Sequence, residues 1–311
     1  MDATLRFALE QVLFTFLFPL AGAALTLWVS RAWARAGRLA PAHRGAIALT
    51  VGMALAYWGV LGREAFLGLS AQRFIFWGAL AAGVGVFLVE RKLGAGAAPW
   101  SIGTYALILG ALFWLLLSPR VARWDEGWGV TIAGRWILDA VSIALLSWAI
   151  LARESAHRST PALSAPLALS AALAGITLAL SGTLALGQLL ATLGLPLALI
   201  GLLGWRSASI AIGPAALAVF MLSYSAILFY AHHYSDPSIP RGIVGMLALA
   251  PLLQLLLPRR LEARLGVGLG LLITLPLLLL SLYGGLAWDE SLDQADSKSA
   301  DPEAAYDPYS Y

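Results

Sequence analysis

Long apolar runs, each followed by a short polar stretch, recur along almost the whole chain. About 20 apolar residues in a helix cross the roughly 30 Å hydrocarbon core of a bilayer. By that length criterion the pattern predicts ten membrane-spanning helices. They are expected near residues 7–29, 45–62, 74–90, 98–117, 135–152, 162–182, 184–204, 210–230, 241–257 and 265–287.

The stretch 162–204 holds no charged residue. As one helix it would be roughly 64 Å long, about twice the thickness of the bilayer core. Ser181, Gly182 and Thr183 lie at its middle and are small, turn-compatible residues. The stretch is therefore predicted to form two spans joined by a tight hairpin.

Composition supports a membrane protein. Hydrophobic residues make up 60% of the 311 residues and charged residues only 12%, against about 25% charged in a typical soluble domain. A single soluble core of this size cannot enclose that much apolar surface. The predicted fold class is an all-α, polytopic transmembrane helix bundle at residues 1–288, followed by a short acidic tail at 289–311.

The basic residues predict an orientation. The loop from Arg31 to Arg44 carries four arginines and no acidic residue, and such loops stay on the cytoplasmic side. Alternation from there places twelve Lys and Arg residues inside and eight outside, with both termini extracytoplasmic. Asp2 and Glu10 argue against a cleaved signal peptide, which needs a positive n-region. We expect a multi-pass protein of a bacterial-type plasma membrane.

The tail differs from the rest of the chain. Residues 289–311 hold seven acidic residues and one lysine, and such a composition predicts disorder when the tail is alone. One interpretation is a solvating tail. The other is a docking segment for a membrane or extracytoplasmic protein, in which Tyr306, Tyr309 and Tyr311 contact the partner, since tyrosine is enriched at interfaces.

Candidate binding residues are few, because an ionisable side chain within a span is unusual. Asp139 lies about one turn below the predicted outer face, and Ser142 follows it on the same helix face. An ion pair with Arg135, four residues earlier, is the structural alternative for Asp139. Further candidates are Gln188 in the seventh predicted span and, at the outer end of the eighth, Tyr230 and His232.

Other polar and proline residues have structural interpretations. Ser170, Thr177 and Ser181 form one stripe, and Gln188 with Thr192 another, which predicts hydrogen bonds between helices. Gly78-x-x-x-Ala82 predicts close helix approach. Prolines concentrate in the last four spans, where they predict kinks: Pro196, Pro214, Pro251 and Pro276.

No motif indicates a particular chemistry. The chain has no cysteine, which excludes thiolate metal sites and disulfides. It has no phosphate-binding glycine loop, nucleophile elbow or HExxH. No cofactor, metal or nucleic acid is predicted. The leading hypothesis is a structural or accessory membrane subunit that docks a partner. The alternatives are a small-solute transporter with a site near Asp139 and, third, an outward-facing membrane enzyme.

Overall fold

The computed structural model describes residues 13–36, 40–62, 72–93, 98–121, 128–207, 209–234 and 239–252. Within these ranges every regular element is a helix and no strand is present. A single π-helical turn, η1 (Leu13–Leu17), leads into the first helix. The helices are α2 (Phe18–Arg35), α3 (Pro41–Leu61), α5 (Gln72–Leu93), α6 (Ala98–Val121), α7 (Trp128–Ser155), α8 (Thr160–Leu180), α9 (Leu184–Arg206), α10 (Pro214–Tyr234) and α11 (Arg241–Leu249).

The predicted fold class is confirmed: the chain is an all-α, polytopic membrane bundle. Eight of the described helices, α2, with η1, to α10, are long and apolar enough to cross a bilayer. They correspond to the first eight predicted spans. The ninth predicted span begins at Arg241, as expected, and is described as far as Leu252. The tenth, at 265–287, and the tail lie outside the described residues.

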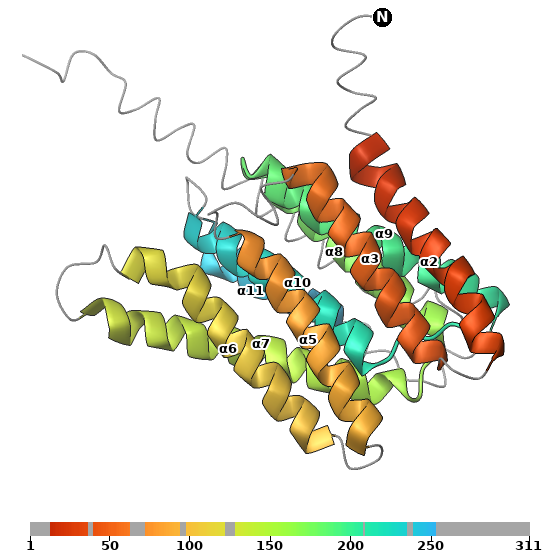
Figure 1. Ribbon diagram of the computed structural model, residues 1–311. Helices are drawn as coiled ribbons and strands as arrows, with labels where there is room; N and C mark the ends of the chain where they lie inside the picture. The colour runs from red at the N-terminus through yellow and green to blue at the C-terminus, as the bar shows by residue number, and fades with distance from the viewer. Residues whose placement is uncertain are drawn as a thin grey trace, which may run out of the picture.

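Helix α10 occupies the centre of the bundle. It packs against α3, α5, α6, α7, α9 and α11. In its apolar 18-residue stretch, 89% of the residues are buried. Figure 1 shows α10 behind α5, with α2 and α3 on one side and α6 and α7 on the other. Pro214, predicted to kink a span, instead lies at the first position of α10, where the fixed backbone angle of proline suits a helix start.

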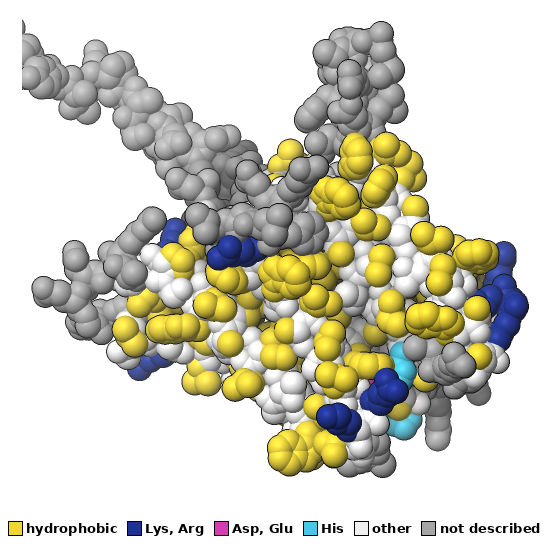
Figure 2. All heavy atoms as spheres, in the orientation of Figure 1, with side chains coloured by type: hydrophobic (Ala, Val, Ile, Leu, Met, Phe, Trp, Pro, Cys, Tyr) yellow, Lys and Arg dark blue, Asp and Glu magenta, His cyan; other side chains and the backbone are white. Residues whose placement is uncertain are grey.

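Successive helices alternate in direction, so the bundle has two ends. We call them the Arg44 end, where α3 and α10 begin, and the Trp136 end, where α10 ends. Figure 2 shows hydrophobic side chains across the middle of one face and Lys and Arg side chains near its two ends. This distribution suits a bilayer, because charged side chains leave the hydrocarbon for the interfaces.

Helices α8 and α9 form the predicted hairpin, which turns at Ser181–Thr183 with Gly182 at a φ of +83°. Their backbones approach closely where Gly175 faces Gly187: a Cβ built on either glycine lies 2.5 Å from the carbonyl oxygen of the other. The prediction that polar stripes bond between these helices is wrong for Thr177 and Thr192. Their hydroxyls donate to Leu173 and Leu189 of their own helices, so close backbone packing rather than polar bonding joins the pair.

A buried polar network lies at the Arg44 end. The sequence placed Arg44 in a basic loop, but α3 begins at Pro41 and the Arg44 side chain is only 2% exposed. Its Nε donates to Ser30 Oγ at 3.1 Å, one Nη donates to the Leu27 carbonyl at 2.8 Å, and the other to the Ser209 carbonyl at 2.7 Å. Arg44 therefore joins α2, α3 and the α9–α10 connection.

Three further contacts hold the α9–α10 connection in place. The Ala211 amide donates to the Pro41 carbonyl at 3.2 Å, and Thr160 Oγ1 donates to the Ile210 carbonyl at 3.2 Å. Trp148 Nε1 donates to the Pro214 carbonyl at 3.0 Å. The connection is thus bonded to α8 and, through Pro41 as well as Arg44, to α3, and the first residue of α10 is bonded to α7.

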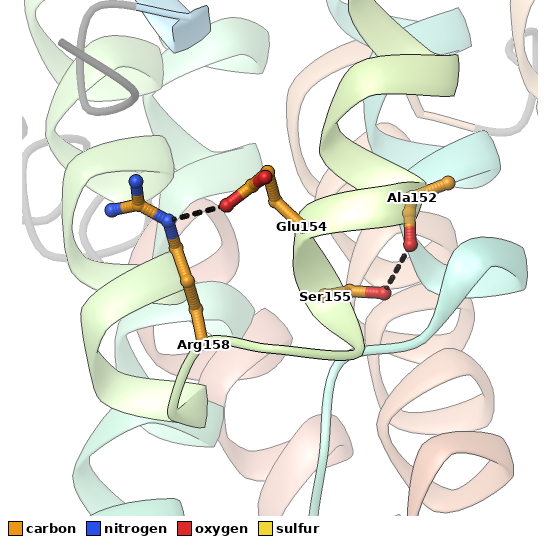
Figure 3. A network of polar contacts seen from close by, with 4 residues as sticks. All are labelled: Ala152, Glu154, Ser155 and Arg158. Atoms are coloured by element: carbon orange, nitrogen blue, oxygen red, sulfur yellow. Dashed lines mark hydrogen bonds and ion pairs between the residues drawn. The ribbon is translucent and has the colours of Figure 1, made fainter. Parts of the chain in front are cut away.

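An ion pair lies beside this network, where α7 ends. Arg158 Nε donates to Glu154 Oε2 at 3.1 Å, and Ser155 Oγ donates to the Ala152 carbonyl at 2.7 Å (Figure 3). The amide of Arg158 also donates to the Glu154 carbonyl. These bonds satisfy groups that the end of a helix leaves without partners and complete the turn into α8.

Candidate functional site

A cavity of about 220 Å³ lies between α7, α10 and α11 at the Trp136 end. We call it the Asp139 pocket. Most of its lining is apolar, and the polar exceptions come from three different helices. The lining residues are Phe113, Trp136, Asp139, Ala140, Ile143, Ala144, Ser225, Leu228, Phe229, His232, His233, Arg241, Val244, Gly245 and Ala248.

Helical spacing explains which side chains reach the pocket. Helix α7 contributes Trp136, Asp139 and Ile143, and α11 contributes Arg241, Val244 and Ala248. Both sets follow i, i+3, i+7, which marks one face of a helix. Tyr224 of α10 positions α11, since its hydroxyl donates to the Leu247 carbonyl at 2.7 Å.

An aromatic and imidazole cluster forms one wall of the pocket. The ring of His233, 4% exposed, contacts those of Phe229 and Trp136, with ring centroids 4.5 and 4.6 Å away. The Arg241 guanidinium lies 4.9 Å from the centre of the Trp136 ring, within cation–π range. This cluster links α7, α10 and α11.

The orientation of the His232 imidazole is fixed by a hydrogen bond. Its Nδ1 lies 2.6 Å from the Ile239 carbonyl, and because a carbonyl oxygen only accepts hydrogen bonds, Nδ1 is the donor. In the neutral ring Nε2 then remains an acceptor. The bond also ties the end of α10 to the residues that precede α11.

Asp139 has no ion-pair partner among the described residues. The alternative pairing with Arg135 is not formed there, although the two residues are one turn apart on α7. No hydrogen bond joins Asp139 to His232 within the same part of the chain. The Asp139 carboxylate and the His232 imidazole therefore line the same pocket as separate groups and do not form an acid–base dyad.

The five predicted binding residues separate in the structure. Asp139 and His232 line the same pocket. Ser142 is exposed on α7 and Gln188 is half-buried on α9, and neither lines the pocket. Tyr230 lies outside it as well, with its ring stacked 4.6 Å from that of Tyr234. Tyr306, Tyr309 and Tyr311 lie outside the described residues.

Sequence reasoning did not select Trp136, His233 or Arg241 as site residues. Arg241 is the first residue of the ninth predicted span, and it was used only in the count of basic residues on the outer side of the membrane. A signal was present, because Arg241, Val244 and Ala248 share a helix face in the same way as Trp136, Asp139 and Ile143. That signal does not say which helices are neighbours.

A metal site is not assembled in the described part of the chain, where no group of three His, Asp or Glu side chains is close enough to hold an ion. Comparison with protein-family models, with curated proteins and with solved structures finds no match to this chain. Fold and site together define a multi-pass helical membrane protein with a small, mainly apolar pocket that carries charged groups near one end.

Proposed function

We propose that this chain is a small-solute transporter in which the Asp139 pocket is the solute site on the extracytoplasmic side. The observation that carries the proposal is that Asp139 and His232, far apart in the sequence, line one cavity together with Arg241. Ionisable side chains within spans are commonly found along solute pathways. Pockets for small ligands are likewise mostly apolar with a few placed polar groups.

The unequal ends of the bundle agree with this proposal. The pocket reaches α10 from the Trp136 end, whereas the Arg44 network holds the α9–α10 connection at the other end. Transporters alternate between states that are open to one side and closed to the other. We assign the structure to the outward-facing state of such a cycle, with the Asp139 pocket reached from the Trp136 end and the Arg44 network holding the helices together at the other end.

Orientation is part of the proposal, and the described basic residues support it. More of them lie at the Arg44 end, which we place in the cytoplasm of a bacterial-type cell. That end holds Arg31, Arg35, Arg44, Arg91, Lys92, Arg153, Arg158 and Arg206, and the Trp136 end holds Arg73, Arg120, Arg135 and Arg241.

Single cysteines test the orientation without removal of any native cysteine. In intact cells a membrane-impermeant maleimide is expected to label Ala300→Cys. His157→Cys, between α7 and α8, is expected to react only after the membrane is permeabilised. Labelling of position 157 in intact cells would reverse the orientation.

A second labelling experiment tests the solute site. Gly245→Cys places a thiol on the pocket wall, where a Cβ meets nothing within 4 Å. A charged methanethiosulfonate is expected to modify it in intact cells, because the reactive thiolate forms in water. Leu138→Cys is the control: it precedes Asp139 on α7, is 65% exposed and does not line the pocket, so it faces lipid and is expected to remain unmodified.

Equal protection of the two cysteines would mean that the pocket holds no water, and the transporter proposal would then fail. The leading sequence hypothesis, an accessory subunit that docks a partner through residues 289–311, would then be preferred. It depends on a segment outside the described residues and stays a prediction.

A further inference from the structure

We propose that the ligand of the Asp139 pocket is a small zwitterion with an apolar body, in which a carboxylate or phosphate contacts Arg241 and an ammonium contacts Asp139. This inference rests on the proposed solute site and adds its chemical class. A free amino acid with an apolar side chain has this chemistry. The headgroup of phosphatidylethanolamine carries the same two charges, and the experiments below distinguish the two sources.

Two charged side chains of opposite sign line the pocket, each from a different helix. Arg241 comes from α11 and Asp139 from α7. The Arg241 guanidinium contacts the face of the Trp136 ring, and this contact uses none of its N–H groups as a donor to an oxygen atom. These N–H groups are therefore available to an anion. Asp139 has no ion pair among the described residues, so its carboxylate is available to a cation.

The two groups lie at different depths. Arg241 is level with Trp136, which it contacts. Asp139 follows Trp136 by three residues, a rise of about 4.5 Å along the helix. A free amino acid with its carboxylate level with Trp136 and its ammonium about one turn farther from the Trp136 end matches this order.

The deeper part of the pocket is apolar. Ile143, Ala144, Leu228 and Ala248 line it, one further turn along α7 and α11. The apolar side chain of a bound amino acid packs here. The cavity volume, about 220 Å³, is below the range of about 300–1,000 Å³ for drug-sized ligands, which favours a molecule of amino-acid size or a single headgroup.

Electrostatics favours a zwitterion over a simple ion. A cation alone would neutralise Asp139 and leave Arg241 without an anion, and an anion alone would neutralise Arg241 and leave Asp139 without a cation. A zwitterion contacts both groups and enters with no net charge, which lowers the cost of bringing it into a medium of low dielectric constant. The pair of wall charges therefore selects for ligands that carry both signs.

Calorimetry on the full-length chain in detergent tests the free-ligand source with three probes of similar apolar body: L-leucine, 3-methylbutan-1-amine and 4-methylpentanoate. Leucine is expected to bind at least about tenfold more tightly than either single-charge probe, as is usual when one charged contact is lost. Asp139→Asn should reduce the affinity for leucine to that of the wild-type chain for 4-methylpentanoate. Arg241→Gln should reduce it to that of the wild-type chain for the amine. Arg135→Gln, exposed on α7 and outside the pocket, should leave leucine binding unchanged.

Native mass spectrometry tests the lipid source. If phosphatidylethanolamine is the ligand, the wild-type chain should retain it in preference to phosphatidylcholine, whose quaternary ammonium has no N–H for Asp139. Asp139→Asn should abolish that preference. Selective retention of phosphatidylethanolamine without leucine binding would identify the ligand as the lipid headgroup.

The outcomes separate this inference from the proposed function. If the amine or the acid binds as tightly as leucine does, the inference that the ligand is a zwitterion is wrong, but the proposed solute site is unaffected. Absence of both leucine binding and the lipid preference would also overturn it, whereas the labelling of Gly245→Cys judges the solute site independently.

Discussion

Arg44→Leu is expected to destabilise the folded chain by about 2–4 kcal/mol. The side chain is 2% exposed and donates to the Leu27 and Ser209 carbonyls and to Ser30 Oγ. A hydrogen bond to a charged group contributes about 1.5–3 kcal/mol. Part of the total is offset because leucine, unlike arginine, does not bury a charge.

Denaturant unfolding of the detergent-solubilised chain measures this effect. Arg35→Leu is the matched control, since Arg35 is exposed in the last turn of α2, and a change within about 0.5 kcal/mol is expected for such a surface site. Arg44→Lys should lower the free energy of unfolding by an intermediate amount, because an ammonium has fewer N–H donors than a guanidinium and lacks its planar geometry. If Arg44→Leu and Arg35→Leu unfold alike, the network does not stabilise the Arg44 end.

Gly187→Leu is expected to lower the stability by about 3 kcal/mol, at the upper end of the usual cost of overpacking. A Cβ at this position would lie 2.5 Å from the Gly175 carbonyl oxygen and 2.7 Å from the Ala179 amide nitrogen. Both atoms belong to the backbone of α8, so no side-chain rotation relieves the contact. The two helices must separate to admit the substitution.

Gly110→Leu in α6 is the control for this prediction, and the same unfolding measurement compares the two variants. A Cβ on Gly110 meets nothing within 4 Å, and replacing a helical glycine improves helix propensity by up to about 1 kcal/mol. The two substitutions are thus expected to change stability in opposite directions. Equal effects would show that the approach of α8 to α9 does not depend on Gly187.

Much of the fold was predictable from the chain alone. The positions of the first eight spans follow from local apolarity, which needs to match only the bilayer thickness. The hairpin at Ser181–Thr183 follows because an uncharged stretch twice the bilayer thickness has to turn. Asp139 and His232 were selected as candidates for a similar local reason, since polar groups stand out against apolar neighbours.

Other features could not be read from the sequence. Arg44 was assigned to a loop as one of four arginines in a basic stretch, yet in the fold α2 and the α9–α10 connection supply hydrogen-bond acceptors for its buried side chain. Arg241 and His233 became site residues only because α7, α10 and α11 lie together. The missing Arg135–Asp139 pair shows that correct spacing on one helix does not ensure contact.

The sequence by itself determined that this protein crosses a membrane many times, where its described spans lie and which few polar side chains interrupt them. The tertiary structure alone decided that α10 is central, that Arg44 is buried and that Asp139 shares a pocket with Arg241. The physical reason lies in the solvent. In water, the apolar face of a helix identifies the side that packs. In lipid, the outward face is apolar as well, so the pattern that locates a span contains little information about its neighbours.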